Sequence, residues 1–458
     1  MKILFATAEL RPLVSSGGLG EAAAGLVGGL RRAGHDVEVM LPNYGNWELE
    51  DSRSINLDVP YWARPMSVTQ GIKADVGPLT LVDGPKIRRP DPYVDANGVG
   101  WPDNDLRFAA FSAAIAARAD SGDYDVIHLN DWHTGLVPAL MTKPKPTVLT
   151  IHNLAHQGWA NLGWLHELPT GRDEYTHGDS LNMLAGAIRM SDAVVAVSPT
   201  YATEILTPEQ GMDLHLELAS RGEDLVGIRN GIDTASWDPT ADPFLDSGYQ
   251  AGDLAGKLEA RSKLLARIGW PDDRLPLIVM VTRLVEQKGV DLALELAPYL
   301  PGMRARLAIL GSGDKDLANQ ARAASEADPD HLWFFDGYDI GLSHEMFAGG
   351  DLYLMPSRFE PCGLAQMQAM AYGTIPIVTG VGGLLDTVVD ATSDRRNGTG
   401  FVTHSVDAIG LVDGVHRALA AWRVGFQRRK IMERGMAIDW SWDRPAQEFV
   451  DVYSSIQP

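Results

Sequence analysis

Two short segments combine charged side chains with glycines in a pattern that suits phosphate chemistry. The segment 282–289 carries Arg283 and Lys288 after an apolar run, and the segment 356–373 carries Glu360. Negative charge develops on a diphosphate leaving group as its bond breaks, and fixed cations stabilise that charge. A carboxylate beside such cations can bind the hydroxyls of a sugar. The two segments therefore indicate a site for an activated sugar, with an ordinary solvated charge pair as the alternative for Arg283 and Lys288.

Two glycine-containing turns are expected to present helix N-termini to a ligand. A helix is predicted to begin near Gly363 and Leu364, where the N–H groups of its first turn attract anions. The turn SSGGLGE (15–21) similarly joins an apolar run to a helical stretch, and its glycines let the backbone approach a ligand closely. A glycine turn that serves only packing fits the second segment equally well.

Polar side chains also follow two neighbouring apolar runs. His128, Asp131 and His133 follow one run, and His152 and Asn153 follow the next. Ligands bind at the carboxyl ends of the strands in open parallel sheets, so these clusters favour the wall of a binding site over a core. Their spacing is not that of a zinc pair on a helix.

No metal and no cofactor other than an activated donor is expected. The chain has one cysteine, Cys362, so neither a disulfide nor a cysteine-based zinc cluster can form within it. The triplet DND at 103–105 has the form of a metal-binding motif, but it starts a predicted amphipathic helix, and we assign it no metal.

Composition narrows the class of protein. The 458 residues are 45% hydrophobic and 22% charged, which is typical of a packed globular protein long enough for two domains. The formal net charge of -21 disfavours nucleic acid or an anionic membrane as the main partner. No apolar run is long enough to span a bilayer, and the N-terminus lacks a signal-peptide pattern, so we expect a cytoplasmic protein.

Apolar runs alternate with helical patterns along the whole chain, which predicts an α/β fold with parallel sheets. The runs lie at 2–8, 36–42, 125–130, 147–152 and 193–198, and then at 277–283, 305–311, 332–337, 351–357 and 375–380. A segment rich in Pro, Gly, Asp and Ser, 238–256, separates the two series and is the predicted linker. The expected domains are therefore 1–240, with the helix of 441–458 crossing back to it, and 241–440.

Taken together, these motifs resemble the bacterial glycogen and starch synthase family, in order along nearly the whole chain. The matching segments include GGLGE (17–21), HLNDWHTGLVPA (128–139), TIHNLAHQG (150–158), RNGIDTASWDP (229–239), TRLVEQKGVDL (282–292) and SRFEPCGLAQM (357–367). The resemblance implies a GT-B fold, in which two Rossmann-like, doubly wound parallel-sheet domains face each other across a cleft. The N-terminal domain then lies on the acceptor side, and the C-terminal domain binds the nucleotide donor.

The resemblance also implies roles for single residues. Arg283 and Lys288 hold the donor diphosphate, and Glu360 and His152 bind the transferred sugar. The other implied donor-binding residues are Gly18, Asn153, Asn230, Tyr338, Cys362, Gly363 and Leu364. Glu21 and Asp131 are implied on the acceptor side. The implied reaction retains anomeric configuration by front-face displacement, in which the leaving phosphate accepts the proton of the incoming nucleophile.

The sequence departs from the family pattern at three places in or beside the implied donor site. The family has a lysine that reaches the donor phosphates where this chain has Ser15-Ser16. A family threonine is replaced by Ala365, and a polar stretch before a later glycine pair is replaced by Thr379, Gly380 and Val381. These changes favour an altered choice of donor or acceptor.

Three functions remain open from the sequence, and the oligomeric state is not predicted. The first is transfer of a glucosyl-type group from a nucleoside-diphosphate donor to a saccharide acceptor, with α configuration. The second is a pseudoglycosyltransferase of natural-product biosynthesis, which couples a nucleotide-activated cyclitol to an amine or another small acceptor. The third is a non-catalytic sugar-binding protein, which the retention of Arg283, Lys288, His152 and Glu360 argues against.

Overall fold

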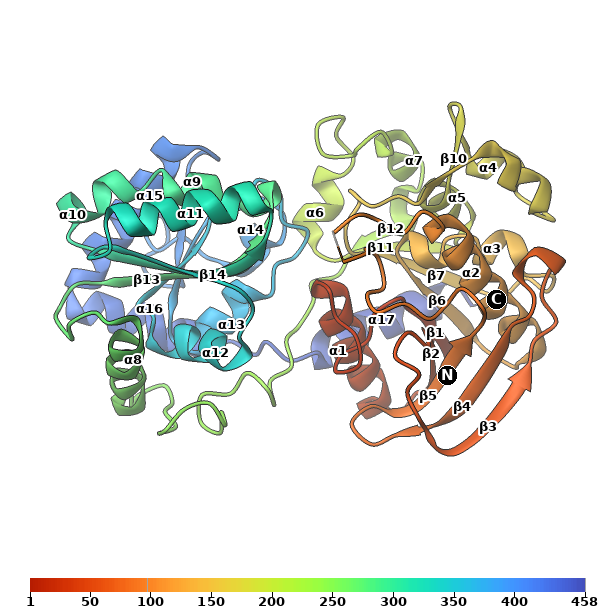
Figure 1. The fold of residues 1–458 in the computed structure, drawn as a ribbon, viewed down its shortest axis with the longest axis horizontal. Coiled ribbons are helices and arrows are strands. Elements are labelled where there is room, and N and C mark those ends of the chain that lie inside the picture. Colours follow the sequence, from red (N-terminus) through yellow and green to blue (C-terminus); the bar gives the residue numbers. More distant parts are fainter. Residues whose placement is uncertain (97, 458) are drawn as a thin grey trace. The chain divides into compact units, whose positions relative to one another are not determined.

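The computed structural model describes residues 1–96 and 98–457. The chain forms two compact units (Figure 1). Unit 1 comprises Met1–Gly231 and Trp442–Pro458, and unit 2 comprises Ile232–Ser441. The domain boundaries predicted from the sequence, after residues 240 and 440, lie nine residues after and one residue before the observed ones. Among the described residues no helix has the length and apolar character needed to cross a membrane.

Unit 1 is built on a nine-stranded sheet with the order β12-β11-β7-β6-β1-β2-β5-β4-β3. In chain order the strands are β1 (Lys2–Ala6), β2 (Asp36–Pro42), β3 (Glu50–Asn56), β4 (Ser67–Lys73), β5 (Gly77–Asp83), β6 (Val126–Asn130), β7 (Thr147–Ile151), β11 (Ala193–Ala196) and β12 (Leu225–Gly227). All neighbours from β12 to β5 pair in parallel, and β4 and β3 continue the sheet antiparallel. The central strands β1, β6 and β7 are buried almost throughout, as their continuous apolar runs require.

The helices of unit 1 follow the strands in the usual crossover pattern. They are α1 (Gly18–Arg32), α2 (Asn104–Ser121), α3 (Val137–Leu140), α4 (Arg172–Tyr175), α5 (Met183–Met190), α6 (Pro199–Glu204), α7 (His215–Ala219) and α17 (Asp443–Ser455). A small sheet of β8 (Trp159–Ala160), β10 (Ser180–Asn182) and β9 (Thr176–His177) lies outside the main sheet.

The C-terminal helix α17 packs on α1. A Cβ atom at Gly25 would lie 1.9 Å from Nε1 of Trp442, and one at Gly29 would lie 2.8 Å from Cβ of Ala446. The two glycines therefore allow the close approach of the two helices. The hydroxyl of Tyr453 lies 2.5 Å from Nδ1 of the fully buried His128, which ties α17 to β6.

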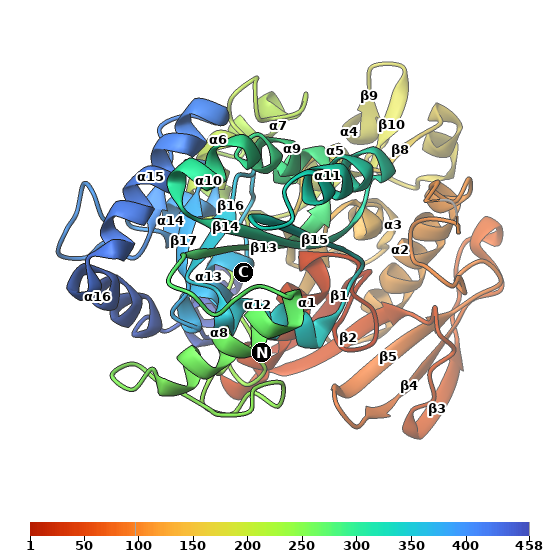
Figure 2. The same ribbon diagram turned by 60° about the vertical axis from the view of Figure 1, so that its left-hand side comes forward.

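Unit 2 contains a six-stranded parallel sheet with the order β15-β14-β13-β16-β17-β18. Its strands are β13 (Leu277–Leu284), β14 (Arg306–Gly313), β15 (Leu332–Asp336), β16 (Leu352–Met355), β17 (Ile375–Val378) and β18 (Phe401–Val402). Its helices are α8 (Ala255–Ile268), α9 (Val290–Leu294), α10 (Leu300–Met303), α11 (Lys315–Ala327), α12 (Ile340–Gly349), α13 (Ala365–Ala371), α14 (Gly383–Thr387), α15 (Ala408–Arg423) and α16 (Gly425–Met436). Figures 1 and 2 show α9 and α11 on one face of this sheet and α8 and α12 on the other.

The segment predicted as a linker, 238–256, is an ordered part of unit 2. Asp242 is buried, and its Oδ2 accepts hydrogen bonds from Tyr372 at 2.5 Å and from Nδ1 of His344 at 2.8 Å. The indole of Trp237 stacks on His344 with 4.0 Å between ring centroids. The segment therefore does not link the two units, since unit 2 begins at Ile232, and buried side chains such as Asp242 fix it within that unit.

Candidate functional site

The predicted charged residues of unit 2 gather at the carboxyl edge of its sheet. Arg283 lies near the end of β13, and Lys288 ends the short 3₁₀ helix η5 (Glu286–Lys288) that follows it. Glu360 lies in the irregular loop after β16, which pairs in parallel with β13. Because neighbouring parallel strands end at the same edge, the loops after β13 and β16 meet there.

Lys288 and Glu360 form a largely buried ion pair. Nζ of Lys288 lies 2.5 Å from Oε2 of Glu360, and only 16% and 7% of the two side chains are exposed. Ser357 Oγ donates a second hydrogen bond to the same oxygen at 3.0 Å. The backbone oxygen of Ser357 in turn accepts the hydroxyl of Thr379 at 2.5 Å. A buried carboxylate requires such partners, and they fix its position.

Arg283 is placed differently. Its side chain is exposed, and no hydrogen bond or ion pair within the described residues holds its guanidinium. Arg283 belongs to the strand β13, whereas Lys288 lies in the segment that follows it. The guanidinium is therefore available to an anion.

The turn at Cys362, Gly363 and Leu364 is held by close contacts. Gly363 has a φ of +73°, which a residue with a side chain rarely adopts. A Cβ atom at Gly383 would lie 2.3 Å from the backbone oxygen of Cys362. Gln366 Nε2 donates to the backbone oxygens of Cys362 and Gly363 at 3.1 and 3.0 Å. The helix α13 begins at Ala365, directly after the predicted start, and no side chain among the described residues caps it.

Tyr338 lies two residues after the end of β15, at the same edge of the unit 2 sheet. Its side chain is 73% exposed. An exposed aromatic ring in this position offers a flat apolar face to a planar group such as a nucleobase.

In unit 1, Asp131 and His152 follow the neighbouring strands β6 and β7. Asp131 has a φ of +53°, and its Oδ1 accepts the backbone N–H of His152 at 2.7 Å. Burial raises the pKa of the Asp131 carboxyl to about 7, while hydrogen bonds from the backbone of His152 and Asn153 oppose that rise. A non-glycine residue with positive φ is strained, and such strain clusters at functional sites.

The tautomer of His152 follows from its neighbour Asn130. Asn130 Nδ2 donates to the backbone oxygen of Ala6 at 2.9 Å, which directs Oδ1 of the same amide toward Nε2 of His152 at 2.8 Å. Nε2 is therefore the protonated nitrogen, and Nδ1 is an acceptor. Burial lowers the pKa of His152 to about 3, so the ring is neutral near pH 7.

Gly17 and Gly18, at the start of α1, have open space around them. A Cβ atom at Gly17 or Gly18 would meet nothing within 4 Å, and neither residue has a positive φ. Neither crowding nor backbone geometry within the described residues requires glycine here. This observation favours the reading in which the backbone leaves room for a ligand.

Sequence reasoning missed Glu9, which holds this glycine turn. Its Oε2 accepts the backbone N–H groups of Ser16 and Gly17 at 2.6 and 3.2 Å. Its Oε1 accepts the hydroxyl of Tyr93 at 2.7 Å, and only 4% of Glu9 is exposed. An acidic residue directly after the first strand was the available signal, but its partner Tyr93 lies 84 residues further along the chain.

The remaining predicted residues are spread over unit 1. Glu21 forms an ion pair with Arg11, Asn153 Oδ1 accepts the backbone N–H of Ala155 at 3.1 Å, and Asn230 is buried in the segment after β12. His128 and His133, which the sequence grouped with Asp131, are both buried in the core of unit 1.

Within the described residues, no three or more His, Cys, Asp or Glu side chains are grouped so that they could hold a metal ion. The DND triplet starts α2 as expected, since α2 begins at Asn104. Asp103 pairs with Arg89 at 2.9 Å, and Asp105 accepts the indole N–H of Trp164 at 3.1 Å.

Comparison with known protein families covers both units. Residues 2–220 match the starch synthase catalytic domain, and residues 265–435 match the glycosyl transferases of group 1. A glycogen synthase of Thioalkalivibrio sulfidiphilus is 39% identical to this chain over 483 aligned positions, which cover 100% of both proteins. A glycogen synthase of Alkalilimnicola ehrlichii is 41% identical over 480 positions, which cover 99% of this chain and 98% of that protein.

Solved structures show the same fold. The catalytic domain of starch synthase IV from Arabidopsis thaliana, bound to ADP and acarbose, superimposes with a TM-score of 0.90 at 31% identity and covers 99% of each chain. A sucrose-phosphate synthase from Thermosynechococcus elongatus matches with a TM-score of 0.64 at 17% identity, over 99% of this chain and 98% of that one, which bears on the fold alone.

Proposed function

Since this chain belongs to the glycogen and starch synthase family of GT-B glycosyltransferases, we propose that it is a retaining enzyme. It transfers a glucosyl-type group from a nucleoside-diphosphate donor to a saccharide acceptor and forms an α linkage. The observation that carries this proposal is the carboxyl edge of the unit 2 sheet, which holds both the Lys288–Glu360 pair and the exposed Arg283 near the end of β13.

The two cations act on the leaving group. Arg283 has no protein partner among the described residues, so its guanidinium is free to pair with phosphate oxygens. Lys288 already lies against Glu360, so it donates to the diphosphate with the two protons that Glu360 does not use. Preorganised positive charge stabilises the diphosphate as the bond to the sugar breaks.

In each unit, polar groups that can bind a sugar hydroxyl are fixed in place before any ligand binds. Glu360 keeps Oε1 for sugar hydroxyls because Lys288 and Ser357 both bind Oε2. His152 offers Nδ1 as an acceptor, and its low pKa keeps the ring neutral. A front-face displacement then needs no protein base, because the departing phosphate takes the proton of the incoming hydroxyl.

We also propose that the reaction needs no metal ion. The positive charge that a divalent cation supplies to a diphosphate in other enzymes comes here from Arg283 and Lys288. The donor-binding residues of unit 2 include one acidic side chain, Glu360, and it is already paired with Lys288.

A panel of donors tests the proposed function. Purified protein is incubated with ADP-glucose, UDP-glucose and GDP-glucose in turn, with maltooligosaccharides as acceptors, and chain lengths are read by mass spectrometry. Growth of the acceptor by one hexose unit with at least one donor is expected. Failure with every donor, while each nucleoside diphosphate still binds by calorimetry, would rule out glucosyl transfer to saccharides.

A second candidate is the coupling of a nucleotide-activated cyclitol to an amine or another small acceptor. The observation that favours it is the turn before α1, which carries Ser15 and Ser16 where the family has a lysine. The side chain of Ser15 donates to the backbone oxygen of Gly17 at 3.0 Å, and the Glu9 carboxylate binds the adjacent N–H groups. Ser15 and Ser16 therefore place hydroxyl groups where the family has a lysine, and the Glu9 carboxylate that holds the turn is buried.

The substitution Ser15→Lys separates the two candidates. If the enzyme transfers glucose, a lysine near the phosphates raises the rate with a nucleoside-diphosphate glucose, because a cation within about 4 Å contributes on the order of 1–4 kcal/mol. If the site has been reshaped for a cyclitol, the lysine gives no gain with glucose donors and lowers coupling of a nucleotide-activated cyclitol to an amine.

A further inference from the structure

The Arg358 side chain occupies the junction between the two loops that carry the proposed donor-binding charges. One loop is 286–289, which follows β13 and carries Lys288, and the other is 356–360, which follows β16 and carries Glu360. Arg358 belongs to the second loop. Its guanidinium binds groups of the first loop and of the helix α9 behind it.

Arg358 donates four hydrogen bonds to groups outside its own loop. Its backbone N–H donates to the backbone oxygen of Gln287 at 2.8 Å, and Nη1 donates to that of Glu286 at 2.8 Å. Nη1 and Nη2 also bind the two carboxylate oxygens of Asp291 at 2.8 and 2.6 Å. This bidentate geometry is the strong form of an arginine–carboxylate pair.

The same loops are joined by further contacts that do not involve the guanidinium. Besides the backbone bond from Arg358, Gln287 Nε2 donates back to the oxygen of Phe359 at 3.2 Å. Gly289 has a φ of +63°, and a Cβ atom there would lie 2.1 Å from the backbone oxygen of Pro356. The loops are therefore in direct contact, and the Arg358 guanidinium adds hydrogen bonds to Glu286 and Asp291.

Asp291 is a suitable anchor for this arginine. It lies in the first turn of α9 (Val290–Leu294), where the helix N-terminus favours a negative charge. The hydrogen bond from Arg358 lowers the pKa of the Asp291 carboxyl, so the pair stays ionised near pH 7. The side chains of Arg358 and Asp291 are 32% and 35% exposed, so the pair is not part of the hydrophobic core.

We propose that Arg358 is a positioning residue, which through Asp291 and Glu286 sets the placement of Lys288 relative to Glu360. This inference rests on the proposed function, because it assigns Lys288 and Glu360 to the donor. A displacement of about 1 Å at reacting groups can lower a rate by about 100-fold. Loss of Arg358 therefore reduces turnover although its guanidinium is directed at protein groups.

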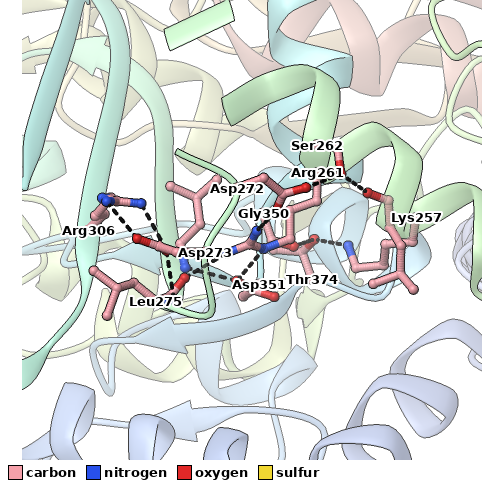
Figure 3. A network of polar contacts seen from close by, with 12 residues as sticks. Lys257, Arg261, Ser262, Asp272, Asp273, Leu275, Arg306, Gly350, Asp351 and Thr374 are labelled. Carbon is pink, nitrogen blue, oxygen red and sulfur yellow. Dashed lines mark hydrogen bonds and ion pairs between the residues drawn. The ribbon is translucent and has the colours of Figure 1, made fainter. Parts of the chain in front are cut away.

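A second arginine–aspartate pair in unit 2 provides a matched control. Arg306 binds both carboxylate oxygens of Asp273, at 3.1 and 2.9 Å (Figure 3). Arg306 is the first residue of β14, so this pair lies at the opposite edge of the sheet from Lys288 and Glu360. The Arg306 side chain is only 7% exposed, so its removal costs at least as much stability as removal of Arg358.

The experiment compares Arg358→Gln, Asp291→Asn, the double variant and Arg306→Gln in the full chain. For each, kcat and KM for the donor, nucleoside-diphosphate binding by calorimetry and the thermal midpoint are measured. We expect Arg358→Gln and Asp291→Asn each to lower kcat/KM by about 10–100-fold, with no further loss in the double variant. Arg358→Lys should recover part of this loss, and Arg306→Gln should keep kcat/KM within about threefold of wild type.

Two results overturn the proposal. One is a kcat/KM for Arg358→Gln within about threefold of wild type. The other is a loss of kcat/KM in Arg306→Gln that equals the loss in Arg358→Gln when the two variants have the same thermal midpoint. If Lys288→Ala loses activity while Arg358→Gln does not, the positioning role fails and the proposed function stands. If Arg283→Ala and Lys288→Ala both stay active, the role of the two cations at the diphosphate fails, and the positioning role that rests on it fails too. Absence of transfer by the wild-type protein with every donor would refute the proposed function itself.

Discussion

Nζ of Lys288 lies 2.5 Å from Oε2 of Glu360, although the two residues are 72 positions apart in the chain. Arg283 lies near the end of β13, the strand that precedes Lys288, and has no such partner among the described residues. The two cations therefore differ in what their removal does to the folded protein, and this difference separates effects on catalysis from effects on stability.

Removing either cation should lower turnover strongly. We expect Arg283→Ala and Lys288→Ala each to reduce kcat by about 10²–10³, since one preorganised group at a developing charge typically contributes about 3–4 kcal/mol. Arg283→Ala should leave the thermal midpoint unchanged. Lys288→Ala should also destabilise the chain by about 1–3 kcal/mol, because it leaves the Glu360 carboxylate buried with one partner fewer.

Steady-state kinetics and thermal unfolding of the two variants check this prediction. Lys315→Ala, which removes an exposed cation at the start of α11, is the control and should match wild type in both. Turnover within about threefold of wild type for both Arg283→Ala and Lys288→Ala is incompatible with a role at the diphosphate.

Gly18→Ala should separate ligand binding from folding. A Cβ atom at Gly18 meets nothing within 4 Å, and alanine is the better residue inside a helix, so the free energy of unfolding should stay the same or rise by up to about 1 kcal/mol. If the donor approaches this backbone, the added methyl group should raise KM for the donor at least tenfold.

Gly302→Ala is the control for that substitution. Gly302 lies in α10 of unit 2, and a Cβ atom there also meets nothing within 4 Å. Like Gly18→Ala, it should leave the free energy of unfolding the same or slightly higher, but it should leave KM for the donor unchanged. An unchanged KM in Gly18→Ala as well would assign the glycine no part in donor binding.

Chelation should not affect the reaction. Dialysis against EDTA, followed by assay in metal-free buffer, is expected to leave kcat unchanged because Arg283 and Lys288 supply the positive charge at the diphosphate. A loss of activity that magnesium or manganese restores would show that the two cations are insufficient.

Acid should destabilise unit 1 through its buried histidines. Burial lowers the pKa of His128 to about 3, whereas an unfolded chain binds a proton near the ordinary pKa of 6.5. The free energy of unfolding is therefore not reduced by His128 above pH 6.5, and it declines as the pH falls below that value because the unfolded chain binds a proton there. The glutamine of His128→Gln cannot titrate. The free energy of unfolding of this variant should therefore fall by about 1 kcal/mol less than that of wild type between pH 7 and pH 5.5.

Urea unfolding at the two pH values measures this difference. The Asp131 carboxyl, whose pKa burial raises to about 7, acts in the opposite direction throughout this range and is common to both proteins. An equal decline of the free energy of unfolding in wild type and His128→Gln would contradict the assignment of a neutral buried imidazole.

The sequence predicted the parallel core of each unit because its strands are continuous apolar runs. It did not predict β3 to β5, which extend the sheet of unit 1. β3 is exposed along almost its whole length and carries no apolar run, whereas β5 (Gly77–Asp83) has a short buried apolar run that was not recognised as a strand. The short strands β8 to β10 likewise depend on pairing within the fold rather than on a local pattern.

The candidate site was predictable where function resides in single motifs. Lys288 and Glu360 were each predicted from their own segment, and the structure brings them together. Glu9 and Arg358 were missed as functional residues because their roles depend on partners such as Tyr93 and Asp291, 84 and 67 positions away. No local pattern in the chain marks such pairs.

The stereochemistry of transfer tests directly whether this protein is a retaining glucosyltransferase. An α-configured nucleoside-diphosphate glucose is incubated with a maltooligosaccharide, and proton NMR follows the anomeric signal of the product and the release of the nucleoside diphosphate. We expect a new α linkage that forms at the same rate as the diphosphate is released. A β linkage, or release of the diphosphate without transfer to the saccharide, would contradict it.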